Sequence, residues 1–516
     1  MKNNLINYFI IQAGGKGTRM NHLTLNKPKC LISIKNKPML FYLFEHFPKS
    51  KFIIIAEYKK EILKEYLKIY VKNVNYQIVE VDKNNSGTLS GIKKSLEFIP
   101  IDTPFIITWS DLLFLDNPLP KNLDFKNNNF VGLSSHFTCR WRFKNGKFEE
   151  KRSKKYGVAG FFIFSNKKQL SNLLESGEFV KYLKNAKIKM SSFNLLNTDE
   201  IGTFEKYIKI TKKSRPIRPF NKIEIKKNMV VKIPTDKKGE ELSILEKNFY
   251  KNFKQYNFRF LPKVIAYSPL TLEKINGKSL FYYKNLTFSQ KKEILKQIVN
   301  GLKEIHQAKS PIKAIKENDY EAIIGKTRKR LNEIESLIPF RDETYMVINQ
   351  KKCLNFLKKW EIIEKIMNDF YPSKYVPIHG DLTFSNTLYS PQRRKVYFID
   401  PRGYYGKIKI YGDADYDWAK VYYSLKGNYD QFNIKNFILE IRDGIKINID
   451  SNGWENLEDY FFQLTETNKN KILFYHGIIW LSLTTYAWDN VDSILGAFYN
   501  GIYLLNQFYE QYKKTF

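Results

Sequence analysis

The chain has 516 residues and 43% of them are hydrophobic, so about two or three domains with real cores are expected and wholesale disorder is excluded. Its formal net charge is +34, from 86 Lys and Arg against 52 Asp and Glu. Because the excess is spread along the chain without a long block of like charges, we predict no nucleic-acid partner. A diffuse positive field suits phosphate-rich small molecules.

The three cysteines, Cys30, Cys139 and Cys353, form no CxxC pair, so free thiols in a reducing compartment are expected. The first residues lack the apolar core and cleavage site of a signal peptide, and no uncharged apolar run reaches the length of a membrane span. We therefore predict a cytoplasmic protein without membrane insertion. These features leave open whether it is an oligomer.

Short apolar runs alternate with helical patterns through the first part of the chain. Strands are predicted at 8–14, 51–57, 76–81 and 103–109, with helices at 39–47, 58–72 and 89–98. Strict alternation predicts an α/β doubly wound, mostly parallel sheet with helices on both faces. Ligands bind such sheets at the carboxyl ends of the strands, and Gly14 and Asp111 both follow such ends.

The regular alternation of predicted strands and helices is interrupted at 211–220, TKKSRPIRPF, which contains two prolines and four basic residues. We place a domain boundary there, with a first domain at 1–212 and a second at 213–516. The second domain is expected to be α+β, with a small sheet-based lobe at about 213–275 and a mostly helical lobe at 276–516, which a β-like segment at 375–403 interrupts.

The segment that follows the first predicted strand, IIQAGGKGTRMNHLTLNKPKCL, has the properties of a phosphate cradle. Gly14, Gly15 and Gly17 allow backbone N–H groups to approach a phosphate closely. Arg19 adds positive charge at the same turn, and Lys29 adds more behind the rigid Pro28.

This loop resembles the GxGTR(M) and PK signature of the sugar-nucleotidyltransferase-like family, and the resemblance covers roughly residues 6–212. It implies that Arg19 stabilises a pyrophosphate leaving group and that Lys29 reduces the repulsion between two reacting phosphates. It also implies that Ser86-Gly87-Thr88 recognises the base. The implied nucleotide-binding residues are Gln12, Ala13, Gly14, Gly15, Gly17, Thr18, Gly87 and Thr88.

The same resemblance implies a magnesium site. Asp111, after the strand at 103–109, matches the family's metal-binding aspartate. The second Mg²⁺ ligand of the family is an acid two residues before a Gly-Thr pair, which is Glu200 here, and the neighbouring Asp199 stays an alternative. Glu150 and Lys151 are candidates for the pair that holds the acceptor, although the proline that usually follows is absent.

A second motif, IHGDLTFSNTLY, contains His379, Asp381 and Asn386, and the predicted strand after it ends at Asp400. An acid five residues before an asparagine, followed by an acid at a strand end, is the layout of protein-kinase-like phosphotransfer sites. In that layout Asp381 accepts the proton of a substrate hydroxyl, while Asn386 and Asp400 hold Mg²⁺ on the phosphates of ATP.

The HGD form of this motif resembles the aminoglycoside-phosphotransferase and choline-kinase branch, whose folds have two protein-kinase-like lobes. The resemblance covers about residues 213–440 and implies that Lys232 binds the α and β phosphates of ATP. Glu246 is the candidate ion-pair partner of Lys232, with Glu240 and Glu241 as alternatives. Asp417 is then structural, and the glycine-rich loop of protein kinases is absent before Lys232.

Together the two motifs predict a bifunctional enzyme. It would phosphorylate a sugar or polyol with ATP and transfer a nucleoside monophosphate from CTP or UTP to the resulting phosphate. The product would be an activated building block for capsule, lipopolysaccharide or lipid decoration. Arg402, directly after Asp400 and Pro401, argues against a cationic acceptor.

Three alternatives stay open. One is a choline or ethanolamine kinase joined to a phosphocholine-type cytidylyltransferase. In the second, the kinase-like domain binds a ligand without catalysis. The third, a nucleotidyltransferase that binds RNA, has no motif of interleaved aromatic and basic residues to support it.

Overall fold

The computed structural model describes residues 6–81, 87–120, 123–134, 136–186, 188–211 and 221–515. The chain forms two compact units, and five residues from late in the sequence belong to the first. Unit 1 is Met1–Arg215 with Trp488–Asp492, and unit 2 is Pro216–Ala487 with Ser493–Phe516. The segment in which we expect the domain boundary, 211–220, lies outside the described residues except for Thr211.

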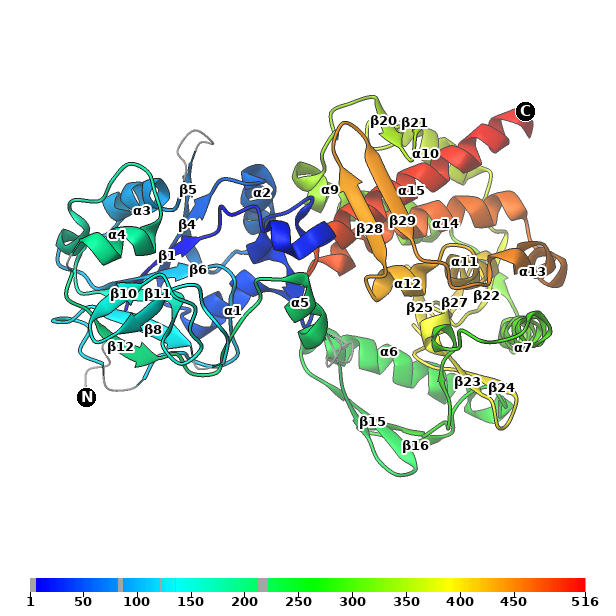
Figure 1. Ribbon diagram of the computed structural model, residues 1–516. Helices are drawn as coiled ribbons and strands as arrows, with labels where there is room; N and C mark the ends of the chain where they lie inside the picture. Colours follow the sequence, from blue (N-terminus) through cyan, green and yellow to red (C-terminus); the bar gives the residue numbers. More distant parts are fainter. Residues whose placement is uncertain are drawn as a thin grey trace. The chain divides into compact units, whose positions relative to one another are not determined.

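The first unit is built on a mixed sheet with the strand order β10-β9-β11-β6-β1-β4-β5, while β8 pairs with β11 and β12 pairs with β8 (Figure 1). Its parallel strands are β1 (Tyr8–Gln12), β4 (Lys51–Ala56), β5 (Asn75–Glu80) and β6 (Phe105–Trp109). The other strands are β8 (Phe130–Ser134), β9 (Arg142–Lys144), β10 (Lys147–Glu149), β11 (Gly157–Phe164) and β12 (Ser191–Asn194). The four predicted parallel strands are confirmed, whereas the antiparallel side of the sheet was not predicted.

Helices cover both faces of this sheet, as the alternating pattern predicts. On one face, Ile10 of β1 belongs to the same buried cluster as Leu89 of α3 (Leu89–Ser95) and Phe179 of α4 (Phe179–Asn185). On the other face, the ring of Phe52 in β4 lies 4.8 Å from that of Phe44 in α1 (Met39–His46). The central strands are therefore buried on both sides, which explains their continuous apolar runs.

Two short strands extend the carboxyl edge of this sheet. β7 (Leu112–Phe114) follows β6 after a two-residue turn and pairs antiparallel with β13 (Thr198–Glu200). The register places Glu200 opposite Leu112, and the backbone N–H of Ile201 donates to the carbonyl of Asp111 at 2.9 Å. Residues almost ninety positions apart in sequence thus meet where the parallel strands end.

The second unit begins with a four-stranded antiparallel sheet in the order β14-β15-β17-β16. Its strands are β14 (Asn221–Ile225), β15 (Met229–Pro234), β16 (Val264–Tyr267) and β17 (Leu270–Glu273), and α6 (Lys237–Phe253) lies between the second and third of them in sequence. The side chain of Asp236 caps α6 by accepting from the N–H of Gly239 at 2.7 Å. This cap fixes the start of the helix that carries Glu246.

Most of the remaining chain is helical. The main helices are α7 (Phe288–Gln307), α9 (Lys326–Ile334), α10 (Trp360–Asn368), α11 (Ala414–Leu425), α13 (Glu458–Thr465), α14 (Lys469–Leu483) and α15 (Val491–Tyr512). The β-like segment predicted at 375–403 contains β22 (Lys374–Pro377), β23 (Thr387–Ser390) and β24 (Lys395–Phe398).

A second four-stranded sheet corrects the prediction of a mostly helical lobe interrupted only at 375–403. It has the order β21-β20-β29-β28 and consists of β20 (Tyr345–Ile348), β21 (Lys351–Leu354), β28 (Phe437–Ile441) and β29 (Ile445–Ile449). The strands alternate buried and exposed positions, for example buried Leu439 beside exposed Ile438. They are too short for that period to stand out in sequence.

Helix α14 is apolar on every side because it is buried within the second unit, where Phe474, Trp480 and Leu481 have no exposed surface. Across the part of the chain that the structure describes, no helix combines the length and apolar character that crossing a membrane requires.

The three cysteines generate a test of the packing. Burial raises the pKa of Cys30 to about 12 and that of Cys353 to about 11, and burial followed by the charge of Glu200 raises that of Cys139 to about 12. The neutral thiol therefore dominates throughout the range below pH 10. We expect the folded protein to react very slowly with an aromatic disulfide reagent at pH 8 and to release three equivalents of the coloured thiolate rapidly in denaturant. Fast labelling of any cysteine in the folded protein would contradict this packing.

Candidate functional site

The glycine-rich loop after β1 presents its charged side chains to solvent. Ala13 donates its N–H to the carbonyl of Ile55 at 3.1 Å, and the carbonyl of Gly14 accepts from the N–H of Tyr58 at 3.2 Å, so the start of the loop is tied to β4 and to the segment after it. Gly17 has a φ of 61°, which lets the chain turn into the helical segment Thr18–Thr24. Gly15, Lys16, Thr18 and Arg19 are exposed and accessible to a ligand.

A second loop, at Gly87 and Thr88, is held against this one. Gln12 donates from its side-chain amide to the carbonyl of Thr88 at 2.8 Å. Gly87 has a φ of 99°, and a Cβ there would lie 2.3 Å from the carbonyl oxygen of Gly177, so only glycine fits. Ser86, predicted to recognise the base with these residues, lies outside the described residues.

Lys29 and Asp111 meet at the carboxyl edge of the sheet. Lys29 Nζ lies 2.6 Å from Asp111 Oδ2, and the two side chains are 12% and 18% exposed. The other oxygen, Asp111 Oδ1, is buried and has no hydrogen-bond partner among the described residues. An ionised oxygen in this state has unused capacity for a cation or a donor.

The register of β13 places Glu200 opposite Leu112 and Asp199 opposite Leu113, so both candidate acids lie within a few residues of Asp111 across the strand pair. Consecutive residues of β13 point to opposite faces, so the two acids cannot serve the same site. Burial raises the pKa of the Cys139 thiol first, and the charges of Glu200 and Asp111 raise it further, which places both carboxylates near that thiol. Glu200 forms an ion pair with Lys206.

The predicted acceptor pair is not assembled in the same way. Glu150 accepts from Arg140 Nε at 2.9 Å, and half of its side chain is exposed. Lys151 donates its backbone N–H to the carbonyl of Glu149 at 2.9 Å. Among the described residues, neither side chain forms a hydrogen bond or an ion pair with Asp111 or Lys29.

One further set of residues supports the Lys29 loop and was not foreseen. Asn26 donates to Asp492 Oδ1 at 3.0 Å, and Lys27, only 1% exposed, forms an ion pair with the same carboxylate. Ser33 donates to Asp489 at 2.9 Å. These acids belong to the segment Trp488–Asp492 of the first unit, more than 450 residues from their partners, so no local pattern signals them.

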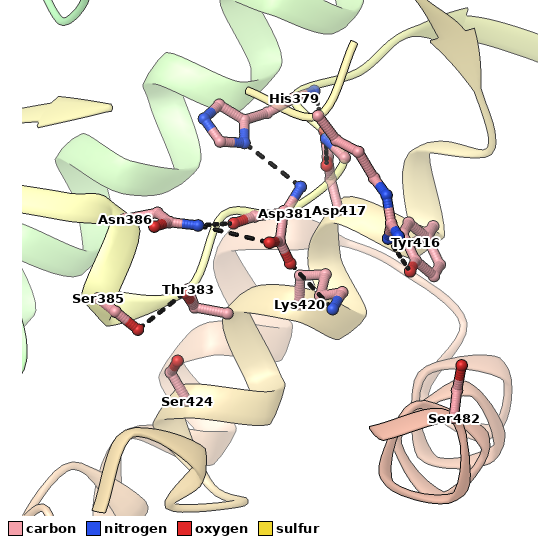
Figure 2. Close-up of polar contacts among 12 residues, drawn as sticks. His379, Asp381, Thr383, Ser385, Asn386, Tyr416, Asp417, Lys420, Ser424 and Ser482 are labelled. Atoms are coloured by element: carbon pink, nitrogen blue, oxygen red, sulfur yellow. Dashed lines mark hydrogen bonds and ion pairs between the residues drawn. The ribbon is translucent and has the colours of Figure 1, made fainter. Parts of the chain in front are cut away.

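In the second unit, Asp417 organises the loop that carries Asp381. Its two carboxylate oxygens accept from the backbone N–H groups of His379 at 2.9 Å and Gly380 at 2.7 Å. His306 lies 3.1 Å from the same carboxylate, and Asp417 has no exposed surface. Figure 2 shows Asp417 close to His379 and Asp381, and its two backbone contacts fix the loop between them.

Asn386 and Asp381 are joined by the short loop between them. The side-chain amide of Asn386 donates to the carbonyl of Asp381 at 2.8 Å, and the backbone N–H of Asp381 donates to His379 Nδ1 at 3.3 Å (Figure 2). Burial lowers the pKa of His379, which keeps the imidazole neutral as that acceptor. His379 is therefore a positioning residue.

Lys232 connects the small sheet to Asp400. Its Nζ lies 2.5 Å from Glu246 Oε1 and also forms an ion pair with Asp400. Glu246 is 7% exposed, whereas the alternatives Glu240 and Glu241 lie on the exposed side of α6. The N–H of Ile399 donates to the carbonyl of Asn386 at 2.9 Å, which sets Asp400 beside Asn386.

The charge of Asp381 is stabilised by its neighbours. Burial by itself raises the pKa of this carboxyl group, but Lys420, whose Nζ lies 2.9 Å from Oδ1, and Arg402 outweigh that effect. The pKa of Asp381 therefore lies below its ordinary value, and the side chain, 39% exposed, is an ionised acceptor at neutral pH.

Comparison with known proteins identifies the first unit. Residues 8–175 match the model of the nucleotidyl transferase family. The chain is 28% identical over 218 residues to D-glycero-α-D-manno-heptose 1-phosphate guanylyltransferase from Campylobacter jejuni, which covers 38% of this chain and 96% of that enzyme. The N-terminal region thus carries a nucleotidyl transferase domain.

Other relatives match over shorter stretches. Mannose-1-phosphate guanyltransferase from Yarrowia lipolytica is 34% identical over 125 residues, which is 23% of this chain and 34% of that protein. Glucose-1-phosphate cytidylyltransferase from Salmonella typhimurium is 29% identical over 126 residues, 20% of this chain and 49% of that protein. This chain spans half or less of the length of those two enzymes. The crystal structure of HddC from Yersinia pseudotuberculosis complexed with GMP-PN covers 40% of this chain and 99% of its own, at 19% identity and a TM-score of 0.33.

Asp417 provides a test of how the Asp381 loop is held. Asp417→Ala leaves two buried N–H groups without an acceptor, so we expect a loss of about 3 kcal/mol from the stability of the second unit. Hydrogen exchange at residues 379–381 should accelerate, and the thermal midpoint should fall. Asp443→Ala, at an exposed aspartate of the same unit, is the control and should change neither. Unchanged exchange in Asp417→Ala would show that other contacts hold the loop.

Proposed function

We propose that the first unit transfers a nucleoside monophosphate from an NTP to a sugar 1-phosphate. An oxygen of the acceptor phosphate bonds to the α-phosphorus, the bond from that phosphorus to the pyrophosphate oxygen breaks, and pyrophosphate leaves with the electron pair. The observation that carries this proposal is the Lys29–Asp111 pair at the carboxyl edge, next to an exposed glycine-rich loop. The names of the relatives add the class of acceptor.

The roles of the individual residues follow from their exposure and charge. Backbone N–H groups at Gly14, Gly15 and Gly17 receive phosphate oxygens, with Ala13 and Thr18 on either side of them. Exposed Arg19 neutralises charge on the departing pyrophosphate. Lys29 is free to contact the reacting phosphates once Asp111 binds something else. Gln12, Gly87 and Thr88 form the wall for the base.

The residues present at this edge fit a magnesium ion. Asp111 offers a buried oxygen without a partner among the described residues, and Glu200, which lies near Cys139 as Asp111 does, is the proposed second carboxylate. The described residues contain no group of three or more His, Cys, Asp or Glu that could hold a metal alone. Mg²⁺ ordinarily binds through one or two carboxylates plus substrate phosphates, so two suffice. When bound, the ion would neutralise charge on those phosphates.

The candidate nucleotide donors include more than CTP and UTP. Two of the relatives named above are guanylyl transferases and one is a cytidylyltransferase, so GTP joins CTP and UTP as candidates. All three act on sugar 1-phosphates by name, which favours a sugar over phosphocholine as the core of the acceptor.

We infer that the second unit is a kinase that uses ATP to phosphorylate a small hydroxyl compound. Asp381 would accept the hydroxyl proton while the hydroxyl oxygen bonds to the γ-phosphorus and ADP leaves. The support is geometric: Lys232 is paired with Glu246 and Asp400, and Asp400 lies beside Asn386. The side-chain nitrogen of Asn386 is engaged by Asp381, so its oxygen is the atom left to bind Mg²⁺ together with Asp400.

The two activities form a chemical sequence. The kinase would make the phosphate monoester that the nucleotidyltransferase then converts to a nucleoside-diphosphate-linked compound, a building block for capsule or lipopolysaccharide. A second unit that binds ligand without catalysis is the competing proposal, and the formation of ADP decides between them.

The two candidate ligands next to Asp111 can be separated by mutation. We expect Asp111→Asn and Glu200→Gln each to lower pyrophosphate release on the order of 100-fold, because each removes charge from the proposed magnesium site. Asp199→Asn is the matched control on the neighbouring position and should stay within about twofold of wild type. Pyrophosphate would be followed with Mg²⁺, each NTP and a panel of sugar 1-phosphates. The reverse ranking of Glu200→Gln and Asp199→Asn would move the second ligand to Asp199.

The two proposed reactions should be separable in one chain. We expect Asp381→Asn to abolish ADP formation, because the hydroxyl loses its proton acceptor, and to leave pyrophosphate release from pre-phosphorylated acceptors intact. Asp111→Asn should do the opposite. Loss of both reactions in either single variant, with folding preserved, would contradict two independent sites. Wild-type protein that never forms ADP would favour the non-catalytic alternative.

A further inference from the structure

Four cationic side chains, Lys420, Arg402, Lys326 and Arg330, gather on one side of Asp381, and the proposed kinase chemistry gives none of them a contact with the acceptor. Lys420 lies on α11, one turn after Asp417, with Nζ 2.9 Å from Asp381 Oδ1 (Figure 2). Arg402 follows Asp400, and its backbone N–H donates to the carbonyl of His379 at 2.8 Å. A Cβ on Gly380 would lie 3.0 Å from Arg402 Cβ, so Arg402 is packed against the residue next to Asp381.

Tyr416 joins three of these cations. The guanidinium of Arg402 donates to the Tyr416 hydroxyl at 3.3 Å. The ammonium nitrogens of Lys420 and Lys326 lie 5.8 Å and 5.9 Å from the centroid of the Tyr416 ring. An aromatic ring attracts cations without carrying a negative charge of its own. The side chains around Tyr416 therefore keep their positive charge for an anionic ligand.

Arg330 stands one helical turn after Lys326 on α9. Its Nη1 donates to the carbonyl and the hydroxyl of Ser482 at 2.7 Å and 2.6 Å, and its guanidinium carbon lies 4.5 Å from the centroid of Tyr486. These contacts fix the direction of the guanidinium and add no negative charge. The turn before α9, Tyr320–Gly325, is π-helical, a rare geometry that often marks functional positions.

The charges of this cluster are not balanced. Among the residues that the structure describes, no carboxylate forms an ion pair with Lys326, Arg330 or Arg402, and Asp381 is the carboxylate paired with Lys420. Burial lowers the pKa of Lys326 well below its ordinary value, and Arg402, Arg330 and Lys420 lower it further, so the four cations are close enough to repel one another. Mutual repulsion of this kind is relieved by an anion bound among them.

We propose that the acceptor phosphorylated by the second unit carries an anionic group, a phosphate or a carboxylate, which Lys326, Arg330 and Arg402 bind while its hydroxyl faces Asp381. The inference rests on the proposed kinase function and names the substrate class of that site. Cationic amino alcohols and aminoglycosides are excluded by the same charges, because a like charge in the cluster would add to the repulsion. Lys420 is left to hold Asp381 in its ionised form.

The test compares acceptors that share a carbon skeleton and differ in charge. The full chain would be assayed for ADP formation with Mg²⁺ and ATP on glucose, glucuronate, glucose 6-phosphate and glucosamine, and on glycerol, glycerate and glycerol 3-phosphate. We expect an anionic member to exceed its neutral counterpart at least tenfold in kcat/KM. Glucuronate and glycerate report a carboxylate, and the two phosphates report a phosphate. A preference for the neutral or amino compounds would overturn the proposal.

Variants connect that preference to the cluster. Lys326→Gln and Arg330→Gln should raise KM for the anionic acceptor about tenfold or more and leave KM for ATP unchanged. Lys329→Gln, at an exposed lysine on the same helix, is the matched control and should behave as wild type. Equal KM values in Arg330→Gln and Lys329→Gln would overturn the proposed binding role.

Calorimetry in the presence of ADP and Mg²⁺ tests anion binding separately from the transfer of phosphate. The probes are inorganic phosphate, glucose 6-phosphate and glucuronate. Binding that is lost in Lys326→Gln and Arg330→Gln, without ADP formation from any acceptor, would support the anion site and refute the kinase. Binding of none of the three probes would refute the anion site itself.

Discussion

Each unit holds a poorly exposed lysine against carboxylates at its candidate site, and this compensation of buried charge is the constraint on which both sites depend. Lys29 is paired with Asp111, and Lys232 with Glu246 and Asp400. Removing one partner from such a pair leaves an uncompensated charge, which costs roughly 3–5 kcal/mol. The pairs therefore compensate these buried charges within the protein itself. In the proposed reactions a bound phosphate and its cation would replace them, because lysine would then meet phosphate and carboxylate would meet metal.

The acceptor side of the second unit follows a different rule. There the lysine and arginine side chains outnumber the carboxylates, and hydroxyl groups, carbonyls and aromatic rings fix their positions instead. Such contacts orient a cation but do not compensate its charge. A bound anion would therefore stabilise this group of side chains. The net charge of +34 is thus spread along the chain and also concentrated where it can select a ligand. Lys420 has a separate part there, because burial by itself raises the pKa of Asp381 and the charge of Lys420 offsets that effect.

Apolar runs and short motifs were enough to predict the parallel strands, the exposed glycine-rich loop after the first of them and the grouping of Lys232, Asp381, Asn386 and Asp400. The choice between Asp199 and Glu200 could not be made from sequence, because it depends on which face of β13 lies toward Asp111. Lys326 and Arg330 gave no signal among 86 basic residues, since only the packing of α9 selects them. The same holds for Asp492, whose contact with Lys27 joins residues 465 positions apart.

The proposed substrate class constrains how the two reactions can be coupled. Phosphorylation of an anionic acceptor gives an intermediate with two anionic groups, and one of them must become the nucleophile at the first site. With a carboxylate acceptor the new phosphate is the only phosphate, so it can enter nucleotidyl transfer directly. With a phosphorylated acceptor the intermediate is a bisphosphate. Removing its original phosphate takes a separate hydrolytic reaction, before or after the nucleotidyl transfer. In the proposed sequence of reactions, carrying both units on one chain would raise the local concentration of the intermediate for the second reaction. The direct route works best for a carboxylate, which is the simpler of the two chemistries that the cluster of Lys326, Arg330 and Arg402 can bind.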